Sequence, residues 1–121
     1  MIVEGERLKR AILVALADIE SQKILDVAMY QPKSVNQIIQ ESNLSHSTAY
    51  RKIRWLVKEK LLIIDKIEIT ETGKKSNLFR SILKSFKVKY EHNNVVIEAE
   101  QNSDTLRKEF TENFFTLSDS G

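Results

Sequence analysis

The chain has no cysteine among its 121 residues, which excludes disulfide bonds, thiolate metal ligands and cysteine nucleophiles. Proline occurs once and glycine three times, so few positions interrupt regular secondary structure. No apolar run approaches the roughly 20 residues that a membrane-spanning helix needs, so we expect no contact with a membrane. Acidic residues near the start, and the lack of a small-residue cleavage site, argue against a signal peptide, as in a cytoplasmic chain.

Groups that carry catalysis are equally scarce. The two histidines, His46 and His92, share no spacing with carboxylates that would suit a zinc site. There is no glycine-rich phosphate loop, and no arrangement of serine, histidine and aspartate stands out. We therefore expect no enzymatic activity, no cofactor and no metal.

What the chain does have is an ordinary apolar content and an uneven distribution of charge. Hydrophobic residues make up 41% of it, which suits one globular domain with or without an added dimerisation element. The formal net charge is only +2, but residues 33–89 hold 13 Lys and Arg against 5 Asp and Glu, whereas residues 90–121 hold 2 against 7. Positive charge gathered in one part of a chain is the pattern expected of phosphate recognition.

The stretch 34–59 predicts two helices joined by a tight turn. Ser34 suits the N-cap of the first helix, because its hydroxyl can accept a hydrogen bond from a free backbone N–H. Asn43 tolerates the left-handed backbone that a sharp turn needs. Either Ser45 or Ser47 then caps the second helix.

The second helix has two distinct faces when its residues are placed at 100° intervals. A helix with one basic face fits the major groove of DNA, with its N-terminal residues at base edges and its cations at phosphates. The alternative is an amphipathic hairpin whose basic face is only solvated, but the turn chemistry and the lack of acids on that face favour DNA. The apolar face consists of Ala49, Ile53, Leu56 and Val57, and the basic face of Ser47, Arg51, Arg54 and Lys58.

The pattern S-V-x-x-I-x-x-x-x-N-L-S-x-S-T-x-Y-R-x-I-x-x-L, which starts at Ser34, resembles the helix-turn-helix of winged-helix transcriptional regulators, particularly the ArsR-like group found in archaea. The resemblance spans about residues 8–100 and implies that segment 45–59 is the DNA-reading helix. The chain departs from the family at two positions where glycine is common, since it has Asn43 and Lys60, and the second departure predicts an irregular helix end. Carried over, the base-reading residues are Ser45, His46, Ser47, Tyr50 and Arg51, and the phosphate-binding residues are Thr48, Lys52 and Arg54.

Helices are also predicted on both sides of this pair, over 5–17, over 19–30 with Asp18 as N-cap, and over 103–117. The first and the last carry apolar residues beyond what one core contact needs. In the resembled family these two helices commonly build a dimer, which would place two reading helices about 34 Å apart on the DNA. Carried over, the dimer-interface residues are Leu13, Leu106, Phe110 and Phe114.

After the reading helix the apolar period changes from about four to two. This change predicts a β-hairpin over 61–83, which is the wing of the resembled family. Its turn segment, 70–77, carries Lys74 and Lys75 at the tip, where we expect contacts with phosphate or the minor groove. A strand that leads into a helix over 72–86 remains an alternative.

A second hairpin is predicted over 85–100, with Asn93 and Asn94 as its two-residue turn. In this register the lysines of the first strand face acids, so we expect them to be paired and not to contact DNA. The register pairs Tyr90 with Ile97 and Val88 with Ala99 on one face, and Lys89 with Glu98 and Lys87 with Glu100 on the other.

These patterns predict an α+β fold: a winged helix-turn-helix with a β-hairpin wing, a second β-hairpin and a C-terminal dimerisation helix. The expected units are a DNA-binding domain over 1–84 and a dimerisation element over 85–121. The expected function is a homodimeric, sequence-specific transcriptional regulator that binds double-stranded DNA and is nucleoid-associated. Two alternatives stay open, an architectural DNA-binding protein without sequence preference and a winged-helix module for protein–protein contact.

Overall fold

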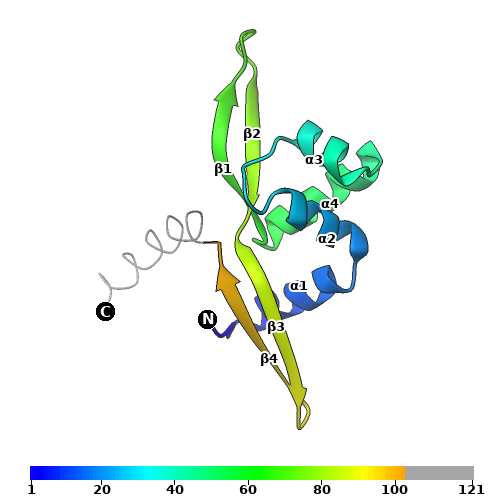
Figure 1. Ribbon diagram of the computed structural model, residues 1–121, viewed down its shortest axis with the longest axis vertical. Coiled ribbons are helices and arrows are strands. Elements are labelled where there is room, and N and C mark those ends of the chain that lie inside the picture. The colour runs from blue at the N-terminus through cyan, green and yellow to red at the C-terminus, as the bar shows by residue number, and fades with distance from the viewer. Residues whose placement is uncertain (103–121) are drawn as a thin grey trace, which may run out of the picture.

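The computed structural model describes residues 1–102, which form four helices followed by two antiparallel β-hairpins. The elements are α1 (Glu6–Leu16), α2 (Ile19–Val27), α3 (Val35–Ser42), α4 (His46–Lys58), β1 (Leu62–Ile69), β2 (Lys75–Ser81), β3 (Leu83–Glu91) and β4 (Asn94–Gln101). The β1–β2 and β3–β4 hairpins extend in opposite directions, and the helices lie together on one side of them (Figure 1). The expected α+β winged helix-turn-helix is therefore confirmed.

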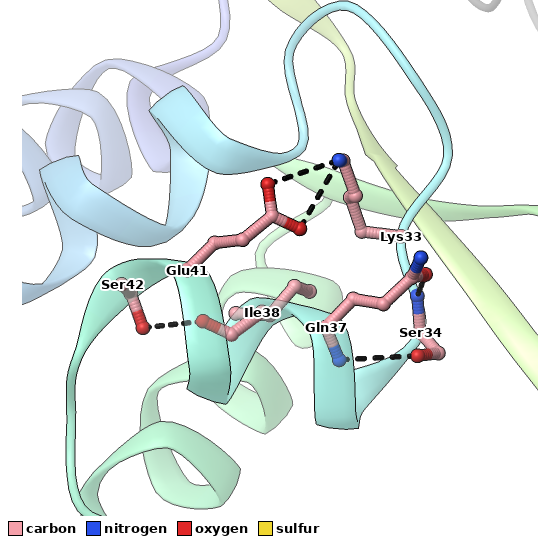
Figure 2. Close-up of polar contacts among 6 residues, drawn as sticks. All are labelled: Lys33, Ser34, Gln37, Ile38, Glu41 and Ser42. Atoms are coloured by element: carbon pink, nitrogen blue, oxygen red, sulfur yellow. Dashed lines mark hydrogen bonds and ion pairs between the residues drawn. The ribbon is translucent and has the colours of Figure 1, made fainter.

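The helix-turn-helix forms as its local sequence predicts. Ser34 and Gln37 make a reciprocal capping box at the start of α3, in which each side chain accepts a hydrogen bond from the other residue's backbone N–H (Figure 2). Asn43 ends α3 with a left-handed φ of 60°. Ser45, and not Ser47, caps α4 by accepting a hydrogen bond from the backbone N–H of Thr48.

The end of α4 is regular although glycine is missing there. Lys60 takes the left-handed conformation itself, with a φ of 64°. Its N–H donates to the carbonyl of Val57 at 3.0 Å, and the N–H of Leu61 donates to the carbonyl of Leu56 at 2.8 Å. These two bonds form a Schellman motif, so the expected irregular end is wrong, and the chain instead places a lysine where glycine is favoured.

The wing is a hairpin, and the alternative helix over 72–86 is excluded because that stretch lies in β2 and β3. A bulge between Ile64 and Lys66 interrupts the pairing of β1 with β2. At the tip Gly73 has a φ of 82°, and the hydroxyl of Thr70 accepts a hydrogen bond from the backbone N–H of Lys74. Glycine is required at this turn because L-residues rarely adopt that conformation.

The second hairpin forms, but its predicted register is wrong by two residues. The turn residues are His92 and Asn93, with φ of 53° and 61°, so the turn does not consist of Asn93 and Asn94. Val88 therefore lies opposite Ile97. The expected lysine–acid pairs change as well: Lys87 lies opposite Glu98, while the Lys89 ammonium contacts Glu91 of its own strand at 3.1 Å.

β2 passes into β3 through a buried joint made of Ser81, Ile82 and Leu83. The hydroxyl of Ser81 donates to the carbonyl of Leu25 at 2.6 Å, and its N–H donates to the carbonyl of Ala28 at 3.0 Å. Figure 1 shows the two strands running on into one another past the end of α2. The joint therefore fixes both hairpins against α2.

Two further contacts close the structure near its ends. Val3 donates its N–H to the carbonyl of Ile97, so the N-terminal residues run alongside β4, which the sequence did not predict. α2 ends at Val27, earlier than expected, and the carbonyl of Met29 instead accepts hydrogen bonds from Arg80 and Asn102.

Side chains of the helices, of β2 and of β4 share one hydrophobic core. The division of the chain at residue 84 stays a prediction.

Candidate nucleic-acid interface

The two faces of α4 lie as predicted. Ala49, Ile53 and Leu56 are buried in the core. On the opposite side Arg51 and Arg54 are exposed. Ser47 and Lys58, the other members of the predicted basic face, are also exposed. Nothing in residues 1–102 therefore covers the surface that the sequence analysis assigned to DNA.

The N-terminal end of α4 presents small polar groups to solvent. Ser45, His46 and Ser47 are exposed, and Tyr50 follows one turn later with its ring half-exposed. Thr48 is half-buried beneath them, and its N–H is used by the Ser45 cap. The free N–H groups and positive dipole end of a helix N-terminus attract anions, so this end of α4 favours phosphate as well as base edges.

The cations of α4 divide into two kinds. Arg51, Arg54 and Lys58 make no ion pair or hydrogen bond through their side chains within residues 1–102. Lys52 differs, because its ammonium lies 2.6 Å from the Asp18 carboxylate and 3.8 Å from that of Glu20. The hydrogen bond from Lys52, together with one from Ser21, holds the pKa of Asp18 below its usual value. Lys52 therefore joins α4 to α2, and the phosphate contact expected from the resemblance would have to compete with Asp18 for its ammonium.

A second ion pair holds the other end of α4. The guanidinium of Arg7 on α1 contacts the Glu59 carboxylate through Nε at 3.0 Å and through Nη2 at 3.4 Å. This hydrogen bond lowers the pKa of Glu59 and raises the pKa of Arg7. The Arg7 side chain is 73% exposed and that of Glu59 is 15% exposed, so solvent screens the pair from the Arg7 side and its contribution to stability is small.

α3 is fixed to the wing as well as to α4. The Lys33 ammonium contacts both carboxylate oxygens of Glu41, at 3.0 and 3.1 Å (Figure 2). The backbone of Lys33 exchanges two hydrogen bonds with Phe79 of β2, at 2.9 and 2.7 Å. The segment that leads into α3 is therefore hydrogen-bonded directly to the wing strand β2.

The predicted phosphate-binding residues of the wing lie at its free end. Lys74 belongs to the tip turn and Lys75 begins β2, and both are exposed. Neither makes an ion pair within the described part of the chain. The tip also lies beyond the end of α3 in Figure 1, so the lysines and α4 are separate parts of the surface.

A hollow of about 320 Å³, which the sequence did not predict, lies between α4 and the wing. Tyr50 and Arg54 approach it from α4, and Ile64 approaches it from β1. The sequence did hold a sign of this apolar surface, because four of the eight residues of β1 are isoleucine. Its lining is Val35, Tyr50, Ile53, Arg54, Val57, Ile64 and Phe79.

Other expectations concern residues that do not meet at this surface. Leu13, the predicted interface residue of α1, is partly exposed, while Leu106, Phe110 and Phe114 lie outside the described residues. In residues 1–102 no three His, Asp or Glu side chains come together as they would around a metal ion. Over the same range no helix combines the length and apolar character needed to cross a bilayer.

Comparison with solved structures adds a weak likeness. No family model matches the chain, and no curated protein matches it. Among solved structures, the crystal structure of NolR from Sinorhizobium fredii is similar, with a TM-score of 0.42 and 14% sequence identity over 87% of this chain and 79% of that chain. A likeness at this level carries no information about function.

Proposed function

We propose that this protein is a homodimeric transcriptional regulator of the ArsR-like, archaeal type, which binds double-stranded DNA sequence-specifically. The observation that carries the proposal is the outward face of α4, where Arg51, Arg54 and Lys58 are exposed and form no ion pair within residues 1–102. A face built only for solubility would mix lysines and arginines with acids. An exposed, purely cationic helix face matches the phosphates that border a major groove.

The residues of α4 divide into base-reading and positioning groups under this proposal. Arg51 and His46 supply most of the base discrimination, with Ser45, Ser47 and Tyr50 beside them. Arg54 and Thr48 contact the phosphate backbone, as do Lys74 and Lys75 at the wing tip. Lys52 acts through its ion pair with Asp18, which holds α4 at a fixed angle to α2.

The dimer is proposed from the sequence of the first and last helices. Leu13 and Val14 of α1 are partly exposed apolar residues that a second subunit would cover. Leu106, Phe110 and Phe114 are the proposed partners from the C-terminal segment. Two subunits related by a two-fold axis would read a pseudo-palindrome with half-sites one helical turn apart.

The test is selection of bound duplexes from a random pool, followed by measurement of affinity against salt for the selected duplex and for a random one. The proposal expects an enriched pseudo-palindrome and a steep salt dependence for both duplexes. Salt-dependent binding without enrichment would identify an architectural DNA-binding protein instead. Absence of DNA binding at low salt would overturn the proposal and favour a protein-contact module.

A further inference from the structure

We propose that the β1–β2 wing carries an apolar wedge, made of Ile67 and Ile69, which enters the minor groove and bends the duplex. The inference rests on the proposed DNA binding. It goes beyond it because it assigns a mechanical role to two residues that phosphate recognition does not need.

The pairing register places these isoleucines on the α4 side of the wing. Ile67 lies opposite Asn77, and Ile69 lies opposite Lys75. Because β2 has no bulge, its alternate residues 75, 77 and 79 share one face, and directly opposed residues of an antiparallel pair share that face too. Phe79 lines the hollow beside Tyr50, so the isoleucine face continues the surface of α4.

Folding does not account for these side chains. Ile67 is 60% exposed and Ile69 is 67% exposed, and both belong to the end of β1 that adjoins the tip turn. The wing as a whole projects past the helices (Figure 1). Ile64, nearer the body, is 47% exposed. An exposed apolar row on a projecting strand is a liability for aggregation, so a binding role is the physical reason for retaining it.

Charge on the same face identifies nucleic acid as the occupant. At its outer end, over Ile67, Ile69, Lys75 and Asn77, the face carries a cation and an amide and no carboxylate, whereas Glu68 alternates onto the other face. Minor-groove proteins combine lysine and asparagine contacts with inserted apolar side chains, which unstack a base step and kink the duplex by roughly 20–90°. Arg54, from α4, lines the hollow at the inner end of this surface, where the proposal places its contact with the DNA backbone.

The experiment compares DNA bending and affinity for the unmodified protein and two variants, by fluorescence energy transfer between dyes at the ends of a selected duplex. The first variant is Ile67→Ser with Ile69→Ser. The matched control is Ile19→Ser, which removes an isoleucine that is 66% exposed on α2, away from the wing. Circular dichroism melts establish that each variant is folded.

The double variant is expected to lose the bend and to bind about tenfold more weakly, because two apolar side chains no longer leave water on binding. The Ile19→Ser control is expected to bend DNA as the unmodified protein does. A bend that persists in the double variant, or no bend in the unmodified protein despite tight binding, would overturn the wedge but leave the proposed DNA binding standing. Loss of self-association in the double variant, with bending unchanged, would assign the face to a second copy of the chain. Absence of DNA binding by the unmodified protein would remove the proposed function and the wedge together.

Discussion

Lys52 of α4 and Asp18 at the start of α2 form an ion pair of 2.6 Å, which connects these two helices. Asp18 occupies the N-cap position of α2, as predicted, but its side chain makes no capping hydrogen bond. It instead accepts from the Ser21 hydroxyl at 2.7 Å and from Lys52. The charge of Lys52 is thus turned toward the body of the protein, unlike that of its neighbours on α4.

This relationship predicts different outcomes for two adjacent cations. Arg54→Ala should lower the slope of log affinity against log salt by about 0.9, because one phosphate contact is lost. Lys52→Ala should leave that slope unchanged. It should lower the free energy of unfolding by about 1 kcal/mol, because the Lys52–Asp18 ion pair is lost and partial exposure keeps the value of that pair small. Binding titrations at several salt concentrations and urea unfolding measure the two effects. Equal changes of slope in both variants would place Lys52 on a phosphate.

The same pair predicts a dependence of stability on pH. The pKa of Asp18 is depressed in the folded state by its hydrogen bonds to Lys52 and Ser21, so its contribution to stability is complete above the ordinary aspartate pKa, about 3.9. It is lost as pH falls through the lower, folded pKa. Asp18→Asn should therefore destabilise the protein by about 1 kcal/mol near neutral pH, and the difference should shrink below about pH 4.

Urea unfolding at a series of pH values measures this difference. Glu20→Gln is the control, because Glu20 lies 3.8 Å from the same ammonium, beyond hydrogen-bond distance. Its effect should be smaller at every pH. A deficit for Asp18→Asn that stays constant down to pH 3 would show that the ion pair is not its origin.

Base reading and phosphate binding should separate on mutation. Arg51→Ala is expected to reduce the preference for the selected duplex over a random one by roughly 1–3 kcal/mol. Lys74→Ala with Lys75→Ala is expected to weaken binding to both duplexes alike, because the wing-tip cations carry no base information. Parallel affinity measurements on the two duplexes test this. Equal losses on both duplexes for Arg51→Ala would contradict the assigned role.

The left-handed lysine after α4 predicts an easy gain in stability. Lys60→Gly should stabilise the protein by about 1 kcal/mol, because an L-residue is strained at a positive φ and the Schellman hydrogen bonds are kept. Lys58→Gly, two residues earlier and inside the helix, should destabilise it by about 1 kcal/mol. Denaturant midpoints measure both variants. Equal signs for the two would show that the backbone conformation of residue 60 does not control the effect.

Among the polar residues near the end of the described chain, Asn102 is predicted to lower the free energy of unfolding most when it is substituted. Its buried amide donates to the carbonyls of Met29 and Ser81, and its oxygen accepts from Arg80 at 3.2 Å. Asn102→Ala should lower the free energy of unfolding by about 2 kcal/mol, because buried carbonyls lose their donor. Gln101→Ala, one residue earlier, should change it little. Thermal melts compare the two, and matching melting temperatures would contradict the prediction.

Features set by local chemistry could be predicted from the sequence. The Ser34 cap, the left-handed Asn43 and the two faces of α4 each depend on residues close together in the chain, and all three are confirmed. The register of the second hairpin was not accessible in this way. A shift of two residues keeps every side chain on its face, so alternation cannot distinguish a His92–Asn93 turn from an Asn93–Asn94 turn.

Features that depend on distant parts of the chain were also missed, because short sequence patterns do not record which distant residues come into contact. Lys52 was assigned to phosphate from the family resemblance, and only the position of α2 reveals its ion pair with Asp18. The pairing of Val3 with Ile97 joins residues from opposite ends of the described chain, which no short pattern records. The isoleucine face of the wing required the register of β1 against β2 before its direction was known.

The buried joint at Ser81–Leu83 connects the two hairpins, because β2 ends there and β3 begins there. The backbone N–H and the hydroxyl of Ser81 attach this joint to the C-terminal end of α2 by hydrogen bonds. Both hairpins therefore share one attachment to α2, so a change at Ser81 would affect the position of both.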